Sequence, residues 1–378
     1  MNPLSNSSGQ PSAYTAVDLA HWRESILRAA ATAAEFIAER ARERHEIVWR
    51  EKSPTDFVTD VDIGAEERIR ASLQASIREL RYVGEELGPT GDTSTGLVAV
   101  VDPLDGTSNF LHGYPSYGVS IGIVLDGVPV AAVVHDVARG GVYTATAGGG
   151  AYLDDVPIRV SSTSTPPRAL IGTGFPFRND DLTAQYLAQL GALIPQVSGL
   201  RRAGAAALDL CDLACGRFDA FWELDLAPWD VAAGVLLVRE AGGVVTDLAG
   251  EHAAITGGAI VGSNGVMHRW LLQLFNGAEE ARIAASLAGG GRRDRRRGDV
   301  IRGDANRTAA PHVDSPRMDS ASMHSDGTPH ADDSASMPSD STPHADDSAS
   351  MHSHGTARAD DSTRTELGGD EAPNAHAW

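Results

Sequence analysis

The apolar residues needed to build a core are confined to the first 275 residues of this chain. Up to that point short apolar runs alternate with glycine-containing turns, whereas residues 276–378 contain almost no Ile, Leu, Val, Phe or Tyr. A segment of that composition buries too little apolar surface to offset the conformational entropy that it loses on ordering. We therefore expect one folded unit over 17–275, a flexible N-terminus over 1–16 and a disordered tail over 276–378.

The expected tail repeats itself. The segments DSASMHSDGTPHAD, DSASMPSDSTPHAD and DSASMHSHGTARAD begin at Asp319, Asp333 and Asp347, which gives a period of 14 residues in three copies. The repeat contains prolines and lacks the apolar seam of a coiled coil, so it is interpreted as a low-complexity array in which single histidines make weak metal sites. The basic run 292-RRDRRRG-298 is expected to be a solvated linker, with contact to nucleic acid or acidic surfaces as the alternative.

Charge and targeting signals narrow the function classes. The formal net charge of −20 argues against a general nucleic-acid binder, although it does not exclude a local basic patch. No apolar run reaches the roughly 18 residues of a membrane span, and the first residues lack a secretion signal. Cys211 and Cys215 lie four residues apart in a helical pattern, which favours core thiols over a disulfide or a zinc site. These features predict a cytoplasmic protein with no membrane contact.

Hydrophobic periodicity predicts both helices and strands within 17–275. Apolar residues at helical spacing indicate helices over 17–45 and 61–79. Further elements are expected as strands over 97–101, 116–125, 129–136, 142–146, 168–172, 218–222 and 243–247, and as helices near 180–191, 204–216 and 228–242. The turn 126-DGVP-129 between two apolar runs predicts a hairpin, so part of the sheet is antiparallel. Grouped strands with helices between them predict an α/β fold in which helices are layered on mixed sheets.

Two carboxylates end the first of these strands, in 98-VAVVDPLDGTSNF-110. Burying Asp102 and Asp105 at a strand end costs several kcal/mol unless a counter-charge compensates them. Other acids stand beside turn or strand-end signals in the same way, namely Asp62, Glu85, Glu86 and Asp230. Acids that converge repel one another, and a divalent cation removes the conflict. Hard oxygen ligands of this kind suit Mg²⁺, so the missing counter-charge is interpreted as metal.

The residues that follow Asp105 suit an anion. In 105-DGTSN-109 a turn opens where a helix begins, and the backbone N–H groups of Gly106 and Thr107 are placed to hold a phosphate. A metal site beside a phosphate cradle predicts phosphoryl hydrolysis by a metal-activated water. Taken singly, each carboxylate is more often a helix cap or a surface acid, and it is their joint occurrence in this order that favours the functional interpretation.

The motifs YVGEE, VDPLDGTSNF and PWDVAAG, in this order and spacing, resemble those of the inositol monophosphatase family of Mg²⁺-dependent, Li⁺-sensitive phosphatases. The resemblance covers roughly 17–275, and the closest match is the bacterial inositol-1-monophosphatase type. It extends to three further segments, 52-KSPTDFVTDVD-62, 170-LIGTGFPFR-178 and 202-RAGAAALDLCDLACGRFDAFWE-223. It implies alternating α-β-α-β-α layers like those of sugar phosphatases, with subdomains at about 17–150 and 151–275.

The resemblance also implies residue roles. The matching metal ligands are Glu85, Asp102, the carbonyl of Leu104, Asp105 and Asp230. Asp62 and Thr107 match the pair that helps to activate the attacking water, and Glu85 is counted with them as catalytic. The substrate-binding positions implied are Asp105, Gly106, Thr107, Ala206 and Glu223, the last of which would hold a ring hydroxyl of inositol. Glu86 and Lys52 match positions near the metal or in the N-terminal loop.

One position departs from the family pattern. Ala205 stands where the family usually has Ser or Thr, which removes a hydroxyl worth about 1 kcal/mol at the substrate rim. We expect catalysis to survive and substrate preference to be affected. The tail has no counterpart in the family.

The resemblance predicts an Mg²⁺-dependent inositol-1-monophosphatase that releases myo-inositol and phosphate, commonly as a homodimer. Alternatives are a related phosphatase acting on histidinol phosphate, fructose 1,6-bisphosphate or adenosine 3′,5′-bisphosphate, or a non-enzymatic role associated with RNA and transcription.

Overall fold

A computed structural model of the protein describes residues 14–53, 56–251 and 255–297. All of them belong to one compact unit, Met1–Asp304, and the second unit, Ala305–Trp378, lies outside the described residues. The predicted N-terminal segment up to residue 13 and the three repeats of the tail also lie outside them. Within the described residues, none of the helices combines the length and the apolar character that crossing a membrane requires.

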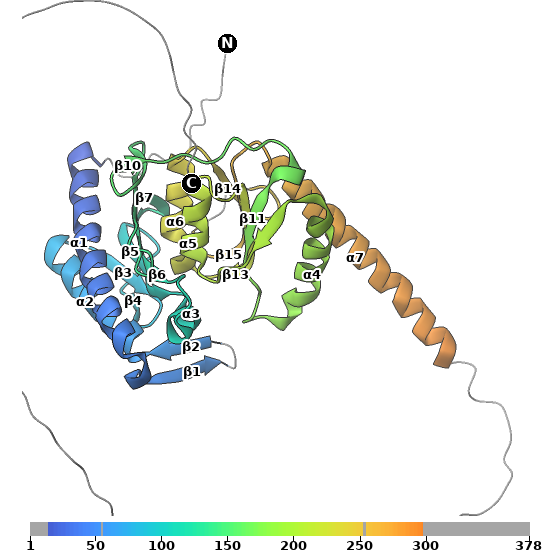
Figure 1. The fold of residues 1–378 in the computed structure, drawn as a ribbon, viewed down its shortest axis with the longest axis horizontal. Coiled ribbons are helices and arrows are strands. Elements are labelled where there is room, and N and C mark those ends of the chain that lie inside the picture. Colours follow the sequence, from blue (N-terminus) through green and yellow to red (C-terminus); the bar gives the residue numbers. More distant parts are fainter. Residues whose placement is uncertain (1–13, 54–55, 252–254, 298–378) are drawn as a thin grey trace, which may run out of the picture. The chain divides into compact units, whose positions relative to one another are not determined.

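An eight-stranded mixed sheet forms the first half of the unit (Figure 1). Its strand order is β10-β9-β8-β7-β6-β5-β3-β4. The strands are β3 (Arg81–Gly84), β4 (Gly88–Thr90), β5 (Leu97–Asp105), β6 (Gly118–Leu125), β7 (Val128–Asp136), β8 (Val142–Thr146), β9 (Gly150–Leu153) and β10 (Val156–Pro157). Only the β3–β5 pair is parallel. The hairpin predicted at 126–129 is confirmed, because β6 and β7 pair in antiparallel register on either side of Asp126 and Gly127.

A five-stranded sheet forms the second half, in the order β12-β11-β13-β15-β14. Its strands are β11 (Leu170–Thr173), β12 (Gly199–Arg201), β13 (Ala220–Leu226), β14 (Val244–Thr246) and β15 (Gly258–Ser263). A separate hairpin, β1 (Trp49–Ser53) with β2 (Asp56–Thr59), belongs to neither sheet. The remaining elements are α1 (Ala16–Arg40), η1 (Ala41–Glu46), α2 (Asp60–Ser76), α3 (Thr107–His112), η2 (Pro166–Arg168), η3 (Asp180–Leu182), α4 (Thr183–Leu193), η4 (Ile194–Gln196), α5 (Ala206–Ala214), α6 (Pro228–Glu240) and α7 (His268–Arg297).

Helices and sheets alternate in five layers, as predicted. Helices α1 and α2 pack on one face of the large sheet, and α5 and α6 fill the space between the two sheets. Helices α4 and α7 cover the outer face of the small sheet. Strand β5 shows why the sequence folds this way. Its residues alternate in facing, so that Ala99 and Val101 join the core under α1 and α2, while Val98 and Val100 pack against Ala232 of α6.

Two predicted boundaries are wrong. The first helix ends at Arg40, and the chain continues as the 3₁₀-helix η1, in which Glu43 has a non-helical backbone conformation. The tail predicted to begin at residue 276 is helical up to Arg297, because α7 continues through that point. Alanines and an ion pair of 2.7 Å between Glu279 and Arg282 support this helix although few large apolar residues are present. A prediction based only on large apolar residues therefore ended the ordered part of the chain too early.

Candidate active site

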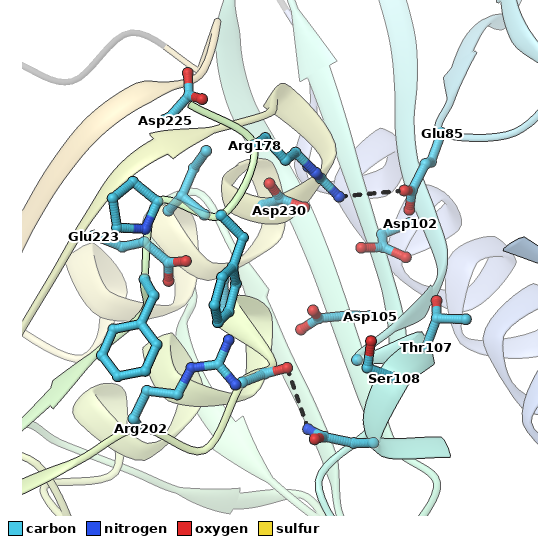
Figure 2. Close-up of a pocket in the computed structure, with 18 of the residues that line it drawn as sticks. Glu85, Asp102, Asp105, Thr107, Ser108, Arg178, Arg202, Glu223, Asp225 and Asp230 are labelled. Atoms are coloured by element: carbon cyan, nitrogen blue, oxygen red, sulfur yellow. Dashed lines mark hydrogen bonds and ion pairs between the residues drawn. The ribbon is translucent and has the colours of Figure 1, made fainter. Parts of the chain in front are cut away.

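A cavity of about 470 Å³ lies where the two sheets, the β1–β2 hairpin and the starts of three helices meet (Figure 2). Its lining residues are Phe57, Glu85, Asp102, Leu104, Asp105, Gly106, Thr107, Ser108, Asn109, Phe175, Pro176, Phe177, Arg178, Arg202, Gly204, Ala206, Glu223, Leu224, Asp225, Leu226 and Asp230. All of the residues that the sequence nominated for the metal, the phosphate and the substrate are in this set, while Asp62 lies behind Thr107.

A β-bulge at the end of β5 turns both of its carboxylates toward the cavity. In a regular strand, residues three apart face opposite sides of the sheet. Here Asp102 pairs with Ser120 and Asp105 with Gly118, so β5 carries one extra residue between them. Figure 2 shows the two side chains on the same side of the strand. The backbone N–H of Leu104 donates to Asp102 Oδ1 over 3.0 Å, which fixes the first carboxylate within the bulge.

Asp105 connects β5 to the helix between the two sheets. Its Oδ2 accepts a hydrogen bond of 2.8 Å from the backbone N–H of Ala207, in the first turn of α5. The next residue, Gly106, has a φ of 85°, and a Cβ there would lie 2.7 Å from the carbonyl oxygen of Ser116. Only glycine therefore fits this turn without strain. The tight turn starts α3 at Thr107, directly beside the carboxylate pair.

Thr107 and Asp62 are in contact, as their predicted partnership requires. The Thr107 hydroxyl donates to Asp62 Oδ1 over 2.8 Å. Asp62 is fully buried and its Oδ2 accepts from the backbone N–H of Thr59 over 2.9 Å, closing the capping box at the start of α2. Burial raises the pKa of Asp62 to about 6, although the hydrogen bonds from Thr59 and Thr107 oppose the increase. The pair thus joins a fixed hydroxyl to a carboxylate that is able to take a proton near neutral pH.

Asp230 faces Asp102 and Asp105 from the other side of the cavity (Figure 2). It lies in the first turn of α6, where Pro228 begins the helix and the backbone N–H of Ala227 donates to Asp230 Oδ2 over 2.7 Å. Burial raises the pKa of Asp105 to about 7, and the negative charge of Asp230 adds to the increase. Burial also raises the pKa of Asp102, with further contributions from Glu85 and Asp105. The three aspartates therefore repel one another across a small space.

Glu85 is the fourth acid of the group, and two cations lie near it. It follows β3 directly, and its carboxylate lies 2.9 Å from Nζ of Lys52 and 3.7 Å from the guanidinium of Arg178. Lys52 also forms an ion pair with Glu86. Burial opposes the charged form of Lys52, yet these two carboxylates raise its pKa above the ordinary value. The resemblance implied positions near the metal or in the N-terminal loop for Lys52 and Glu86. In the structure, Lys52 contacts both Glu85 and Glu86.

The donor set fits a hard divalent cation. The four acids and the carbonyl of Leu104 offer only oxygen ligands, and the neighbouring negative charges add to the burial that raises the pKa values of Asp102 and Asp105. Among the described residues, however, no three His, Cys, Asp or Glu side chains are grouped tightly enough to hold a metal ion as they stand. The acids line one cavity, but they do not form a closed coordination shell in the arrangement seen here.

The far end of the cavity has a different character. Glu223 projects from β13, and burial together with the charge of Asp230 raises its pKa to about 8. A Cβ on Gly174 would lie 1.9 Å from Glu223 Oε1, so glycine at this position leaves room for the carboxylate. The Arg202 guanidinium lies 5.1 Å from the ring centre of Phe175 and 4.9 Å from that of Phe177. Ala206 also lines the cavity.

Sequence reasoning missed several lining residues. The sequence predicted no role for Arg178, Phe175 and Phe177, which lie in a segment that resembles the family, and none for Arg202 and Ser108. An arginine that closes a strand-end segment, as in 170-LIGTGFPFR-178, is the signal that was available. Ala205, where a hydroxyl was expected to be missing from the substrate rim, is buried and is not among the residues that line the cavity. Ala205 is the N-cap of α5, and this helix start has no side-chain capping bond.

Fold and cavity together define a layered α/β protein of the phosphatase type. A family model described as the inositol monophosphatase family matches residues 18–280, and the chain belongs to this family. A Pseudomonas aeruginosa protein named "Nus factor SuhB" is 45% identical over 242 residues, which is 63% of this chain and 89% of that protein. A Rhizobium meliloti "Inositol-1-monophosphatase" is 44% identical over 213 residues, 56% of this chain and 80% of that protein.

Solved structures agree with this assignment. The extragenic suppressor protein suhB from Bartonella henselae superposes with a TM-score of 0.64 at 35% identity, covering 67% of this chain and 97% of that one. The family match ends at residue 280, so most of the segment predicted to be a tail lies beyond it.

Proposed function

We propose that the protein is an Mg²⁺-dependent phosphate monoester hydrolase whose substrate is myo-inositol 1-phosphate or a closely similar polyol phosphate. The observation that carries this proposal is the cavity itself. Four acids converge on it beside a turn that begins a helix, and a threonine hydroxyl bonded to a buried aspartate stands next to them. Membership of the inositol monophosphatase family supports the same reaction class.

Glu85, Asp102, Asp105, Asp230 and the carbonyl of Leu104 would hold the metal. Bound Mg²⁺ would neutralise phosphate charge, lower the pKa of a water molecule and stabilise the leaving alkoxide. The chain's contribution is to fix these acids from different elements: two by the bulge of β5, one at the start of α6 and one after β3. Gly106 and Thr107 would hold the phosphate through their backbone N–H groups.

Thr107 and Asp62 would prepare the attacking water. Because the Thr107 hydroxyl donates its proton to Asp62, its lone pairs remain available to accept a hydrogen bond from water. A proton released by that water then has a path through the hydroxyl to the Asp62 carboxylate. The pKa of about 6 for Asp62 leaves it mostly ionised at pH 7 and therefore able to accept the proton.

Substrate preference would be set at the far end of the cavity. Glu223 would bind a ring hydroxyl, and Ala206 also lines the cavity. We therefore propose a polyol ring as the preferred leaving group.

A kinetic comparison tests the proposal. The full-length protein should release phosphate from inositol 1-phosphate with millimolar Mg²⁺ and not with excess chelator. It should do so more efficiently than from histidinol phosphate, fructose 1,6-bisphosphate or adenosine 3′,5′-bisphosphate, which are the alternative substrates within the family. A higher kcat/KM for one of these three esters would reassign the substrate, and no phosphate release from any of the four would reject the enzyme.

A second candidate function rests on the names of relatives. Several of them are called Nus factor SuhB, which favours a transcription-associated role alongside or in place of catalysis. The two functions separate cleanly in a cell that depends on this protein. An Asp105→Asn variant that supports growth and transcription as the wild type does, while lacking phosphatase activity in vitro, would assign the cellular role to binding.

Three further properties belong to this proposal. We propose that the enzyme is a cytoplasmic homodimer and that Li⁺ inhibits it. Light scattering after size-exclusion chromatography tests the dimer, and phosphate release at increasing LiCl with KCl as the control tests the inhibition.

A further inference from the structure

Glu66 is a fully buried carboxylate that neither lines the cavity nor takes part in the chemistry proposed above. It lies on α2, one helical turn after Asp62. Its two oxygens accept backbone hydrogen bonds from another part of the chain, 2.7 Å from the N–H of Glu86 and 3.1 Å from the N–H of Leu87. Burying a carboxylate costs free energy unless hydrogen-bond donors compensate it. Both bonds therefore help to fix the position of the chain at Glu86 and Leu87.

The segment that Glu66 binds is the turn that carries Glu85. The turn leaves β3 at Gly84 and re-enters the sheet as β4 at Gly88. On the side of the sheet it is fixed by one bond of 3.2 Å, from the N–H of Glu85 to the carbonyl of Val101 on β5. The two bonds from Glu86 and Leu87 to Glu66 fix it on the side of the helix. The turn is thus held on both sides, by the N–H of Glu85 toward the sheet and by those of Glu86 and Leu87 toward the helix.

Gly84 leaves the space that the contact between Glu66 and the turn needs. A Cβ at Gly84 would lie 1.8 Å from Glu66 Oε1 and 2.5 Å from its Cδ. Real Cβ atoms do not approach other atoms so closely, so any larger residue at position 84 would push the carboxylate away from the turn. The backbone conformation of Gly84 does not itself demand glycine, because Gly84 is not among the residues with positive φ. Glycine is needed here for room.

Helix α2 therefore positions two parts of the site at once. At its first turn, Asp62 is fixed by the capping box with Thr59 and receives the Thr107 hydroxyl. One turn later, Glu66 fixes the Glu85 turn. We propose that Glu66 is a positioning residue that holds the Glu85 turn beside Asp62 and the β5 aspartates, so that Glu85 has less freedom to move away when a divalent cation binds. The inference rests on the proposed function, because it assigns Glu85 to a metal.

The test measures cation binding without substrate. Mn²⁺ is titrated into the full-length protein, free Mn²⁺ is followed by electron paramagnetic resonance, and the melting temperature of each variant is recorded beside it. In Glu66→Gln one of the two acceptor oxygens becomes an N–H₂ group that faces a backbone N–H. We expect the Mn²⁺ affinity to fall by about 10- to 100-fold, the range for residues that orient metal ligands. Glu67→Gln is the matched control, because Glu67 is the exposed neighbour on the same helix, and it should bind Mn²⁺ as the wild type does.

Two more variants keep the test decisive if Glu66→Gln does not fold. Glu66→Asp retains the buried charge but shortens its reach, and should lower Mn²⁺ affinity by a smaller factor than the glutamine. Gly84→Ala approaches the same contact from the turn, and combining it with Glu66→Asp should cost much less than the sum of the two single losses. Wild-type Mn²⁺ affinity in the folded Glu66 variants, with only a lower melting temperature, would overturn the inference and leave Glu66 a purely structural residue.

This outcome is separable from failure of the proposed function. A wild-type protein that binds Mn²⁺, loses affinity in Glu66→Gln and hydrolyses no phosphate ester would retain the positioning role and reject the enzyme.

Discussion

The two ends of the cavity are built in different ways. At the acidic end, Asp102, Asp105 and Asp230 are short side chains fixed by backbone N–H groups at a bulge and at helix starts. At the far end, Arg202 is a long exposed side chain that lies over the rings of Phe175 and Phe177. The first arrangement fixes charged groups by backbone hydrogen bonds despite their mutual repulsion, whereas the second is held by contacts between an arginine and aromatic rings. We infer that chemistry is located at the acidic end and substrate choice at the other; three changes test this contrast, and a fourth tests the C-terminal segment.

The largest effect is expected at the acidic end. Asp105→Asn keeps the oxygen that accepts from Ala207 N–H but removes a charge that the metal would need. We expect kcat for phosphate release to fall by at least about 10²–10³. The melting temperature without metal should rise by about 2–4 °C for each kcal/mol of repulsion removed. A variant that keeps its activity would contradict a role for Asp105 in the chemistry. A variant that loses activity and also melts at a lower temperature would show that Asp105 serves the fold.

A smaller and selective effect is expected at Glu223. Glu223→Gln should lower kcat/KM for inositol 1-phosphate about tenfold, which is about 1.4 kcal/mol and typical of one lost hydrogen bond. An aryl phosphate without ring hydroxyls is the matched substrate, and its kcat/KM should change little. Equal losses on the two substrates would break the division between chemistry and substrate choice.

The aromatic wall should respond more weakly still. Arg202→Ala removes a cation–π contact worth about 0.5–1 kcal/mol at an exposed site, so KM for inositol 1-phosphate should change about two- to fivefold with kcat unchanged. Arg201→Ala is the control, because Arg201 is an exposed neighbour that is absent from the cavity lining. A fall in kcat for Arg202→Ala with no effect on KM would place Arg202 with the chemistry.

The smallest effect is expected from the tail. The family match ends at residue 280 and helix α7 ends at Arg297. Deleting residues 298–378 should therefore leave kcat/KM and the melting temperature unchanged within error. A drop of more than a few degrees would show that the deleted segment stabilises the folded unit.

Much of the site was predictable because its chemistry is local. Asp102 and Asp105 end an apolar strand in the sequence, and each of Glu85 and Asp230 stands at a strand end or helix start that is recognisable from its neighbours. What brings them together is not local. The bulge that turns Asp102 and Asp105 to the same side appears only in the pairing of β5 with β6. The contact of Glu66 with the Glu85 turn joins residues 20 apart through a space that only a glycine leaves open.

The two errors have different physical origins. The extent of α7 was missed because a helix of alanines and paired charges needs few large apolar residues. The wall of Phe175, Phe177 and Arg202 was missed because its members come from two loops whose approach is set by the five-stranded sheet.

A crystal of the full-length protein soaked in Mn²⁺ tests the central claim most directly. Anomalous scattering should place at least one ion between the side chains of Glu85, Asp102 and Asp105, with the carbonyl of Leu104 turned toward it. Clear density for these side chains with no anomalous peak between them would contradict the metal-dependent chemistry proposed for this cavity.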